Sequence, residues 1–167
     1  NIKRTSISII FDILYNEYKK LLNQFNFKDV KIRIIGEKKN LPKEITNILK
    51  DLESKTINNK GLNLNIAFNY GTDKELVSII NKIIQIYKNE ENIVNYSMVQ
   101  KLMYLGDSPD PDILIRTGGF QRLSNFLLLK LRYTELFFTK TLWPDFKKNE
   151  LLSIINKYNK IERKYGL

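Results

Sequence analysis

The chain has 167 residues, the size of one ordinary domain, and we expect a single domain over residues 1–167. Lys and Arg total 28 against 18 Asp and Glu, a formal net charge of +10, and 43% hydrophobic residues are enough for a core. The sequence contains neither Cys nor His, which excludes disulfides, zinc fingers, thiol nucleophiles and imidazole bases. Any metal must therefore be a hard cation bound by oxygen ligands.

The positive charge raises the alternative of a basic nucleic-acid-binding domain. Of the 28 basic residues, 22 are Lys, and they are scattered along the chain in singles and pairs. Scattered charge is typical of solvated faces rather than of a continuous surface for a polyanion. The rarer arginines are more informative, because Arg116, Arg122 and Arg132 fall within 17 residues, next to a pair of glycines.

The first half of the chain alternates between helical and strand patterns. Apolar residues at three- and four-residue spacing predict a helix from Ser6 to about Phe25. A strand from Val30 to Ile35 follows, and then a helix after Pro42 with one apolar face. Strict alternation predicts a strand over residues 62–69.

The second half continues the alternation. Thr72 with Glu75 has the spacing of a capping box and predicts a helix through Tyr87, and Ser97 with Gln100 predicts a shorter helix to about Leu105. The remaining predicted elements are a strand over 112–116, a helix over 124–133, a strand over 136–138 and a helix over 147–164. The order predicts an α/β fold, a mostly parallel sheet with helices packed around it.

Ligands of such sheets bind beyond the carboxyl ends of strands, and one strand here ends at Arg116. Gly118-Gly119 then predicts a turn whose N–H groups form an anion-binding nest. Arg122 adds a second guanidinium, and Ser124 adds a hydroxyl at the expected N-terminus of the next helix. The combination indicates a phosphate or diphosphate site. The alternative is an ordinary glycine turn with two surface arginines.

Glu135 lies at the start of the next predicted strand. If the two strands are parallel, it begins at the edge opposite the arginines, where it is a surface carboxylate. A short strand, a bend or a second subunit is needed to bring it to the same pocket.

These segments carry a family resemblance. The chain resembles the cis-prenyltransferases, the family of undecaprenyl and dehydrodolichyl diphosphate synthases. The similar segments are Arg33–Gly36, Leu64–Gly71, Leu114–Gly119, Arg122–Leu128, Tyr133–Thr139 and Leu142–Phe146. The resemblance covers essentially the whole chain in order and implies an undecaprenyl diphosphate synthase-like fold.

The resemblance implies condensation of isopentenyl diphosphate with an allylic diphosphate to give a Z-polyprenyl diphosphate, with Mg²⁺ as cofactor. The residues matching Arg116, Arg122 and Ser124 hold isopentenyl diphosphate in this family, with Leu123 between them. The glutamate matching Glu135 helps to bind Mg²⁺, and the position of Gln121 is associated with the metal, although a neutral amide is a weak ligand. The family also forms dimers, so we expect a homodimer that does not bind nucleic acid.

The sequence departs from the family at its beginning. Residues 1–5 resemble the tail of the family's Glu-Asn-Trp-x-Arg-Pro motif, which implies a catalytic role for Asn1 and allylic diphosphate binding by Arg4. The family's preceding Asp-Gly-Asn loop has no counterpart in this sequence. We therefore expect the C-terminal two thirds of such an enzyme, with the first strands missing, an exposed sheet edge and no activity of its own. Phe120 stands where the family usually has Glu, and Lys164 where it has Arg.

The sequence leaves two alternatives open. A non-catalytic partner subunit of the same family is an alternative to a catalytic one. The apolar helices over 7–21 and 45–52 line a product tunnel or form plain core. We expect a cytoplasmic protein that contacts membranes peripherally through its lipid product.

Overall fold

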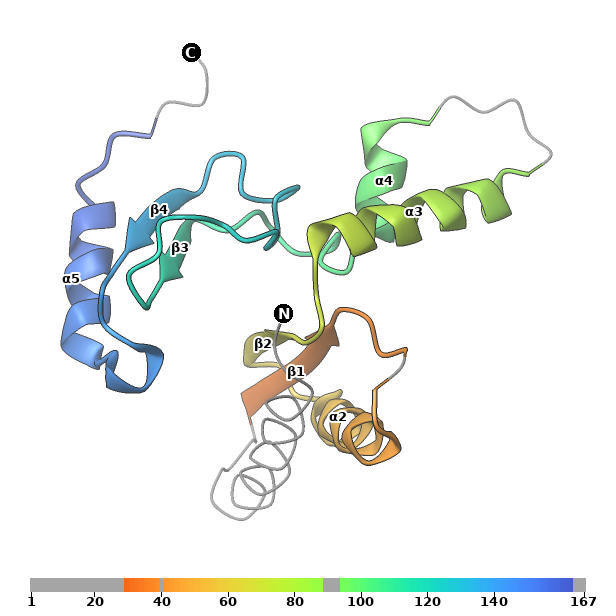
Figure 1. The fold of residues 1–167 in the computed structure, drawn as a ribbon, viewed down its shortest axis with the longest axis horizontal. Helices are drawn as coiled ribbons and strands as arrows, with labels where there is room; N and C mark the ends of the chain where they lie inside the picture. Colours follow the sequence, from red (N-terminus) through yellow and green to blue (C-terminus); the bar gives the residue numbers. More distant parts are fainter. Residues whose placement is uncertain (1–28, 40, 89–93, 164–167) are drawn as a thin grey trace. The chain divides into compact units, whose positions relative to one another are not determined.

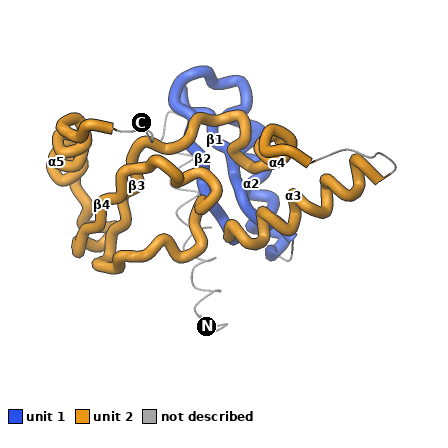
Figure 2. The backbone as a smooth tube through the Cα atoms, turned by 90° about the horizontal axis from the view of Figure 1, so that it is seen from above, with its two compact units in different colours: residues 1–70 blue, residues 71–167 orange. Residues whose placement is uncertain are grey.

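The structure is a computed structural model that describes residues 29–39, 41–88 and 94–163 (Figure 1). The helix predicted over residues 6–25 lies outside these residues, as do Asn1, Arg4 and Lys164. The backbone forms two compact units, residues 1–70 and residues 71–167, which Figure 2 shows in different colours. The expectation of a single domain stays a prediction. The described elements form an α/β fold with parallel strand pairs, as the alternating pattern predicts.

Unit 1 contains β1 (Val30–Ile35), α2 (Lys43–Thr56) and β2 (Leu62–Ala67). The two strands are parallel and in register from Val30 opposite Leu62 to Ile35 opposite Ala67. A parallel pair needs a crossover connection, and α2 provides it. The strands and the helix confirm the predictions for this part of the chain.

The core of unit 1 lies between β1 and α2. Ile32 and Ile34 of β1 are buried with Ile45 and Leu49 of α2. Ile45 and Leu49 are four residues apart and share one face of the helix, which is the apolar face that the spacing predicts. Removal of these side chains from water is the main stabilising contribution in this unit.

The edge of β1 that does not face β2 is bonded to side chains that follow it in the sequence. The N–H of Ile32 donates to Thr56 Oγ1 at 3.0 Å, and the N–H of Ile34 donates to Glu53 Oε1 at 2.8 Å. Asn59 Nδ2 donates to the carbonyl of Val30 at 2.8 Å. Three polar groups on this edge of β1 therefore have partners within the chain, and the expectation of an exposed edge where the family's first strands are missing stays a prediction.

Unit 2 contains two helices, a strand pair and a final helix. They are α3 (Thr72–Ile86), α4 (Tyr96–Leu102), β3 (Ile113–Arg116), β4 (Glu135–Phe138), the 3₁₀ turn η2 (Trp143–Asp145) and α5 (Lys148–Tyr158). The strands are parallel, with Ile113 opposite Glu135 and Arg116 opposite Phe138. The strand predictions are confirmed. The last helix is shorter than predicted and ends at Tyr158.

The helix predicted over 124–133 is wrong, because the segment contains no regular helix. Ser124, Asn125 and Leu127 have φ values of 48°, 63° and 47°, in the left-handed region that a right-handed helix cannot include. The N–H of Leu128 donates to Thr72 Oγ1 at 3.0 Å instead of to a carbonyl of its own turn. The apolar run Phe126–Leu129 has helical composition, but its local bonds, from Phe126 N to the carbonyl of Leu123 and from Lys130 N to that of Leu127, span three residues as in turns, and Leu128 N is bonded to a distant residue.

Both predicted capping boxes are also wrong. Helix α3 has Gly71 rather than Thr72 as its N-cap, and Gly71 makes no side-chain cap hydrogen bond. Its first N–H groups are bonded to Asn125, whose carbonyl accepts from Thr72 N at 2.9 Å and whose Oδ1 accepts from Asp73 N at 3.2 Å. The buried Glu75 accepts from the N–H of Tyr104 at 2.7 Å instead of capping its own helix.

Helix α4 begins two residues earlier than the predicted box requires, because that box makes Ser97 the N-cap. Its N-cap is Asn95, whose side chain accepts from Met98 N at 3.1 Å. An Asn in this position provides the same acceptor as the predicted Ser97, so the helix is confirmed although its cap is not.

Candidate functional site

The Gly-Gly turn directly follows β3. Gly118 and Gly119 have φ values of 85° and 81°, which only glycine adopts without strain. Their N–H groups donate to the carbonyls of Thr141 and Thr139, each at 2.9 Å. The predicted anion-binding nest is therefore wrong, because the carbonyls of Thr141 and Thr139, which follow β4, accept from both donors.

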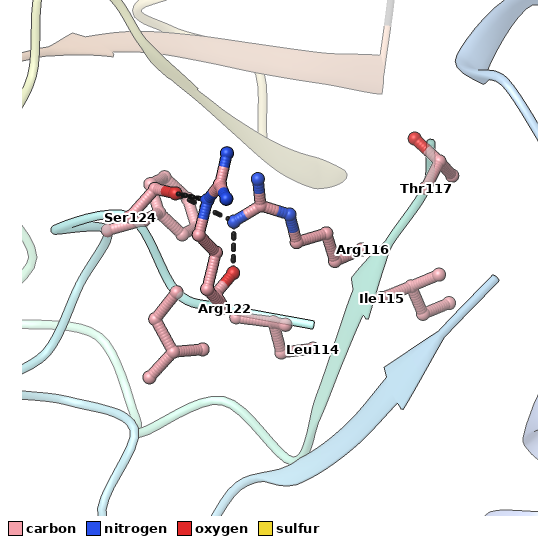
Figure 3. A pocket seen from close by; sticks show the side chains of 8 residues that line it. Leu114, Ile115, Arg116, Thr117, Arg122 and Ser124 are labelled. Carbon is pink, nitrogen blue, oxygen red and sulfur yellow. Dashed lines mark hydrogen bonds between the residues drawn. The ribbon is translucent and has the colours of Figure 1, made fainter. Parts of the chain in front are cut away.

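The two arginines of the predicted site lie together (Figure 3). Arg116 extends from the end of β3 and Arg122 from the loop beyond the turn. Both guanidinium groups point toward Ser124 Oγ, with 2.9 Å to Arg116 Nη1 and 3.3 Å to Arg122 Nε. Arg116 Nη1 also donates to the carbonyl of Arg122. Three residues that the sequence predicts to act together are therefore brought into one cluster, which we call the arginine pair with Ser124.

A pocket of about 380 Å³ adjoins this cluster. Its wall combines the two arginines, Thr117 and Ser124 with four apolar side chains. The residues lining it are Leu114, Ile115, Arg116, Thr117, Arg122, Leu123, Ser124 and Phe126. Leu123, another residue of the predicted site, is part of this wall. The pocket thus presents cationic donors together with apolar surface, a combination that suits an amphipathic anion.

The charge of the arginine pair is not neutralised within the described part of the chain. There, no carboxylate lies within ion-pair distance of Arg116 or Arg122. Arg132, the third arginine of the group, differs because its Nη2 lies 3.1 Å from Asp110 Oδ2. The ion pair and its hydrogen bond raise the pKa of Arg132 above its ordinary value. Two unpaired guanidinium groups beside one hydroxyl favour a multiply charged anion with several acceptor oxygens.

Ser124 is held in place by residues of α3. Its left-handed backbone leads into Asn125, whose amide Nδ2 donates to Asp73 Oδ1 at 2.6 Å. This hydrogen bond, followed by one from the N–H of Lys74, holds the pKa of Asp73 below its ordinary value of 3.8. The first turn of α3 therefore fixes the loop that carries the hydroxyl. Sequence reasoning missed this role of Asn125, because its partners are 52 residues away.

Sequence reasoning also missed the contacts of Phe120. The guanidinium carbon of Arg122 lies 4.4 Å from the centroid of the Phe120 ring, and that of Arg116 lies 5.7 Å from it. Both distances are within the range of cation–π attraction. The available signal was an aromatic residue between the glycine turn and an arginine, at a position where the family usually has Glu.

The two predicted metal ligands are not brought together. Glu135, half-buried, begins β4 opposite Ile113, and its N–H donates to the carbonyl of Asp112. The partner of Arg116 is three residues further along β4, roughly 10 Å at the rise of a strand. Gln121 is exposed in the loop at the arginine end. In the described ranges no three His, Cys, Asp or Glu side chains are grouped as metal ligands would be, so these residues do not fit a Mg²⁺ site by themselves.

A parallel α/β fold with a cationic, partly apolar pocket at the carboxyl end of a strand is typical of proteins that bind anionic ligands. Residues 1–166 match the family model described as "Putative undecaprenyl diphosphate synthase". The isoprenyl transferase of Aquifex aeolicus is 34% identical over 166 residues, covering 99% of this chain and 71% of that protein. That of Fusobacterium nucleatum is 38% identical over 162 residues, covering 97% and 67%.

Solved structures agree with this match. A probable undecaprenyl diphosphate synthase from Campylobacter jejuni superposes with a TM-score of 0.87 at 30% identity, covering 99% of this chain and 77% of that one. Lavandulyl diphosphate synthase from Lavandula x intermedia, in complex with dimethylallyl diphosphate, gives 0.90 at 27% identity, covering 100% and 74%. The chain belongs to the undecaprenyl diphosphate synthase family of prenyltransferases, and it is a transferase. Within the described residues, no helix has the length and apolar character needed to span a membrane.

Proposed function

We propose that this protein belongs to an enzyme of cis-prenyl transfer, the condensation of isopentenyl diphosphate with an allylic diphosphate, and that residues 1–167 by themselves are inactive. The carbon–oxygen bond of the allylic diphosphate breaks, a carbon–carbon bond to the isopentenyl unit forms, and diphosphate and a proton are released. The product is a Z-polyprenyl diphosphate. The observation that carries this proposal is the arginine pair with Ser124, which has no carboxylate partner among the described residues and adjoins an apolar wall.

The pocket suits isopentenyl diphosphate by its chemistry. Arg116, Arg122 and Ser124 supply donors for the diphosphate oxygens, and guanidinium forks bind such oxygens bidentately. Leu123 and Phe126 offer apolar surface for the short hydrocarbon part. Fixing the diphosphate positions the double bond of the isopentenyl unit for reaction with the allylic carbon.

The allylic half of the reaction rests on the resemblance. Asn1 and Arg4 are proposed to act at the allylic diphosphate, and both lie outside the described residues. Binding of Mg²⁺ by Glu135 and Gln121 is proposed from the same family resemblance. Bound Mg²⁺ stabilises the charge of a diphosphate leaving group. The described residues do not by themselves form a Mg²⁺ site.

The assembly and location of the protein are proposals as well. We propose a homodimer, a cytoplasmic location and peripheral membrane contact through the lipid product. The arginine pair favours a catalytic member of the family over a non-catalytic partner subunit, because a partner has no need for an unneutralised diphosphate site. The molar mass from light scattering, against 19.8 kDa for one chain, tests the dimer.

Isothermal titration with isopentenyl diphosphate tests the proposal. The double variant Arg116→Ala/Arg122→Ala is expected to lose affinity by at least about 100-fold, because each charge-assisted hydrogen bond contributes about 1.5–3 kcal/mol. Arg132→Ala is the matched control, since it removes an arginine that is paired with Asp110, and its affinity is expected within threefold of the parent chain. Equal affinity of the double variant and the parent would refute the assigned site.

A further inference from the structure

The arginine pair raises a physical problem of its own. Two guanidinium groups of the same charge share a single hydroxyl oxygen, Ser124 Oγ. Like charges repel, and within the described residues no carboxylate holds Arg116 and Arg122 together. A hydroxyl oxygen has two lone pairs, so the two arginines use its whole accepting capacity. A further group is needed to keep both side chains converged before the anion binds.

Phe120 is in the position to supply it. Its ring centroid lies 4.4 Å from the guanidinium carbon of Arg122 and 5.7 Å from that of Arg116. The face of an aromatic ring carries negative electrostatic potential and attracts cations. The side chain is 53% exposed, so burial in a core does not account for where the ring lies. Its contact with two cations does.

A neutral ring acts differently from the Glu that the family usually has at this place. A carboxylate can form ion pairs with the arginines through their N–H donors. The ring attracts both guanidinium groups but leaves their N–H donors and their net charge available to the anion. Side chains that are already ordered also lose less conformational entropy when the ligand binds.

We propose that Phe120 is a positioning residue that holds Arg116 and Arg122 converged on one diphosphate. The inference rests on the proposed function, because it assigns Phe120 to the site at which isopentenyl diphosphate would bind. Phe120 acts through the arginines and needs no contact with the ligand itself.

The test compares Phe120→Leu, which removes the ring and keeps apolar volume, with Phe120→Tyr, which keeps the ring. In the free protein, NMR of the arginine Nε–Hε groups is expected to show a ring-current shift for Arg122 in the parent and in Phe120→Tyr, and none in Phe120→Leu. Titration with inorganic diphosphate is expected to show about fivefold weaker binding by Phe120→Leu, in line with the strength of an exposed cation–π contact. Phe120→Tyr is expected within twofold of the parent.

The outcomes separate the two proposals. Binding by Phe120→Leu as tight as that of the parent, or a parent Arg122 signal without a ring-current shift, overturns the role of Phe120 while the proposed function stands. A parent chain that binds neither inorganic diphosphate nor isopentenyl diphosphate overturns the proposed function and this inference with it. Melting temperatures of the three proteins are expected to agree, because the ring is half exposed. A large drop for Phe120→Leu alone would make the residue structural and contradict the proposal.

Discussion

Two pairs of cations in unit 2 differ in how their charges are compensated. Lys130 is only 4% exposed, donates to the carbonyls of Leu105 and Ser108 at 2.8 and 2.7 Å, and lies 3.3 Å from Asp110. Arg132 shares the same carboxylate. The arginine pair with Ser124 lies on a pocket and has no such carboxylate among the described residues.

The difference separates cations that stabilise the fold from cations that are available to a ligand. A buried ammonium is tolerated only with good partners, so Lys130 fixes the loop that contains Leu105 and Ser108. A guanidinium without a carboxylate partner keeps its capacity to bind an external anion. In the sequence, Arg116 and Arg122 lie close to the glycine pair on either side, and Arg132 lies further along the chain. In the structure, the ion pair with Asp110 also distinguishes Arg132 from the first two.

Placing a carboxylate beside the arginine pair is expected to have the largest effect. Ser124→Asp puts a negative group where a hydroxyl now contacts both guanidinium groups. We expect the affinity for isopentenyl diphosphate to fall by about 100-fold or more, about 3 kcal/mol, by isothermal titration. Ser124→Ala is the control, and about tenfold is expected there, because it removes one donor and adds no charge. A Ser124→Asp variant no weaker than Ser124→Ala would show that charge compensation does not control this site.

Replacing Lys130 tests the other pair of cations, Lys130 and Arg132. Lys130→Met is expected to lower the free energy of unfolding by about 2–3 kcal/mol, because the carbonyls of Leu105 and Ser108 lose their donor. Urea unfolding followed by circular dichroism measures this change. The affinity for isopentenyl diphosphate is expected within threefold of the parent. A loss of affinity without a loss of stability would reverse the roles assigned to the two pairs.

The loop that carries Ser124 gives a smaller effect. Asn125→Ala removes the side-chain contacts to Asp73 and places a Cβ-bearing residue without a polar side chain at φ 63°. We expect a loss of about 1–2 kcal/mol in the free energy of unfolding. Asn125→Gly also lacks the side chain but tolerates the backbone, so the difference between the variants measures the backbone strain. Equal stability of Asn125→Ala and the parent would show that the contacts of Asn125 with α3 do not stabilise this loop.

The pH dependence of Asp73 is the smallest effect. Its pKa lies below the ordinary 3.8, chiefly because of the hydrogen bond from Asn125. A lowered folded-state pKa stabilises the folded chain above the unfolded-state value, and this contribution decreases as the pH falls through the folded-state pKa. NMR titration of the carboxyl group is expected to give a value below 3.8 in the parent and a higher value in Asn125→Ala. The same value in both proteins would assign the shift to another group.

The sequence predicted those elements whose pattern is local and periodic. The strands β1 to β4 and the helices α2 and α3 are confirmed, because their apolar spacing reports directly on which face is buried. The convergence of Arg116, Arg122 and Ser124 followed from the end of one strand and a short loop. The metal ligands and the residues of the allylic site stay predictions.

The errors have a common physical cause, which is hydrogen bonding between distant segments. The run from Phe126 to Leu129 is apolar like a helix, but the partner of Leu128 N is Thr72, 56 residues away. The glycine nest does not form because the carbonyls of Thr139 and Thr141, which follow β4, accept from the N–H groups of both glycines. The cap of α3 comes from Asn125, so no local motif contains it. The contacts of the Phe120 ring were not predicted, because they depend on the side-chain directions of two arginines.

The hydrogen bonds along the outer edge of β1 have a consequence for how separate molecules meet. Val30, Ile32 and Ile34 already exchange polar contacts with Asn59, Thr56 and Glu53 of the same polypeptide. A strand from a neighbouring molecule must break three internal bonds before it can be added there, which disfavours growth of an intermolecular ladder. Replacing Thr56 with valine removes one of these three hydrogen bonds and leaves the N–H of Ile32 available to a strand of another molecule.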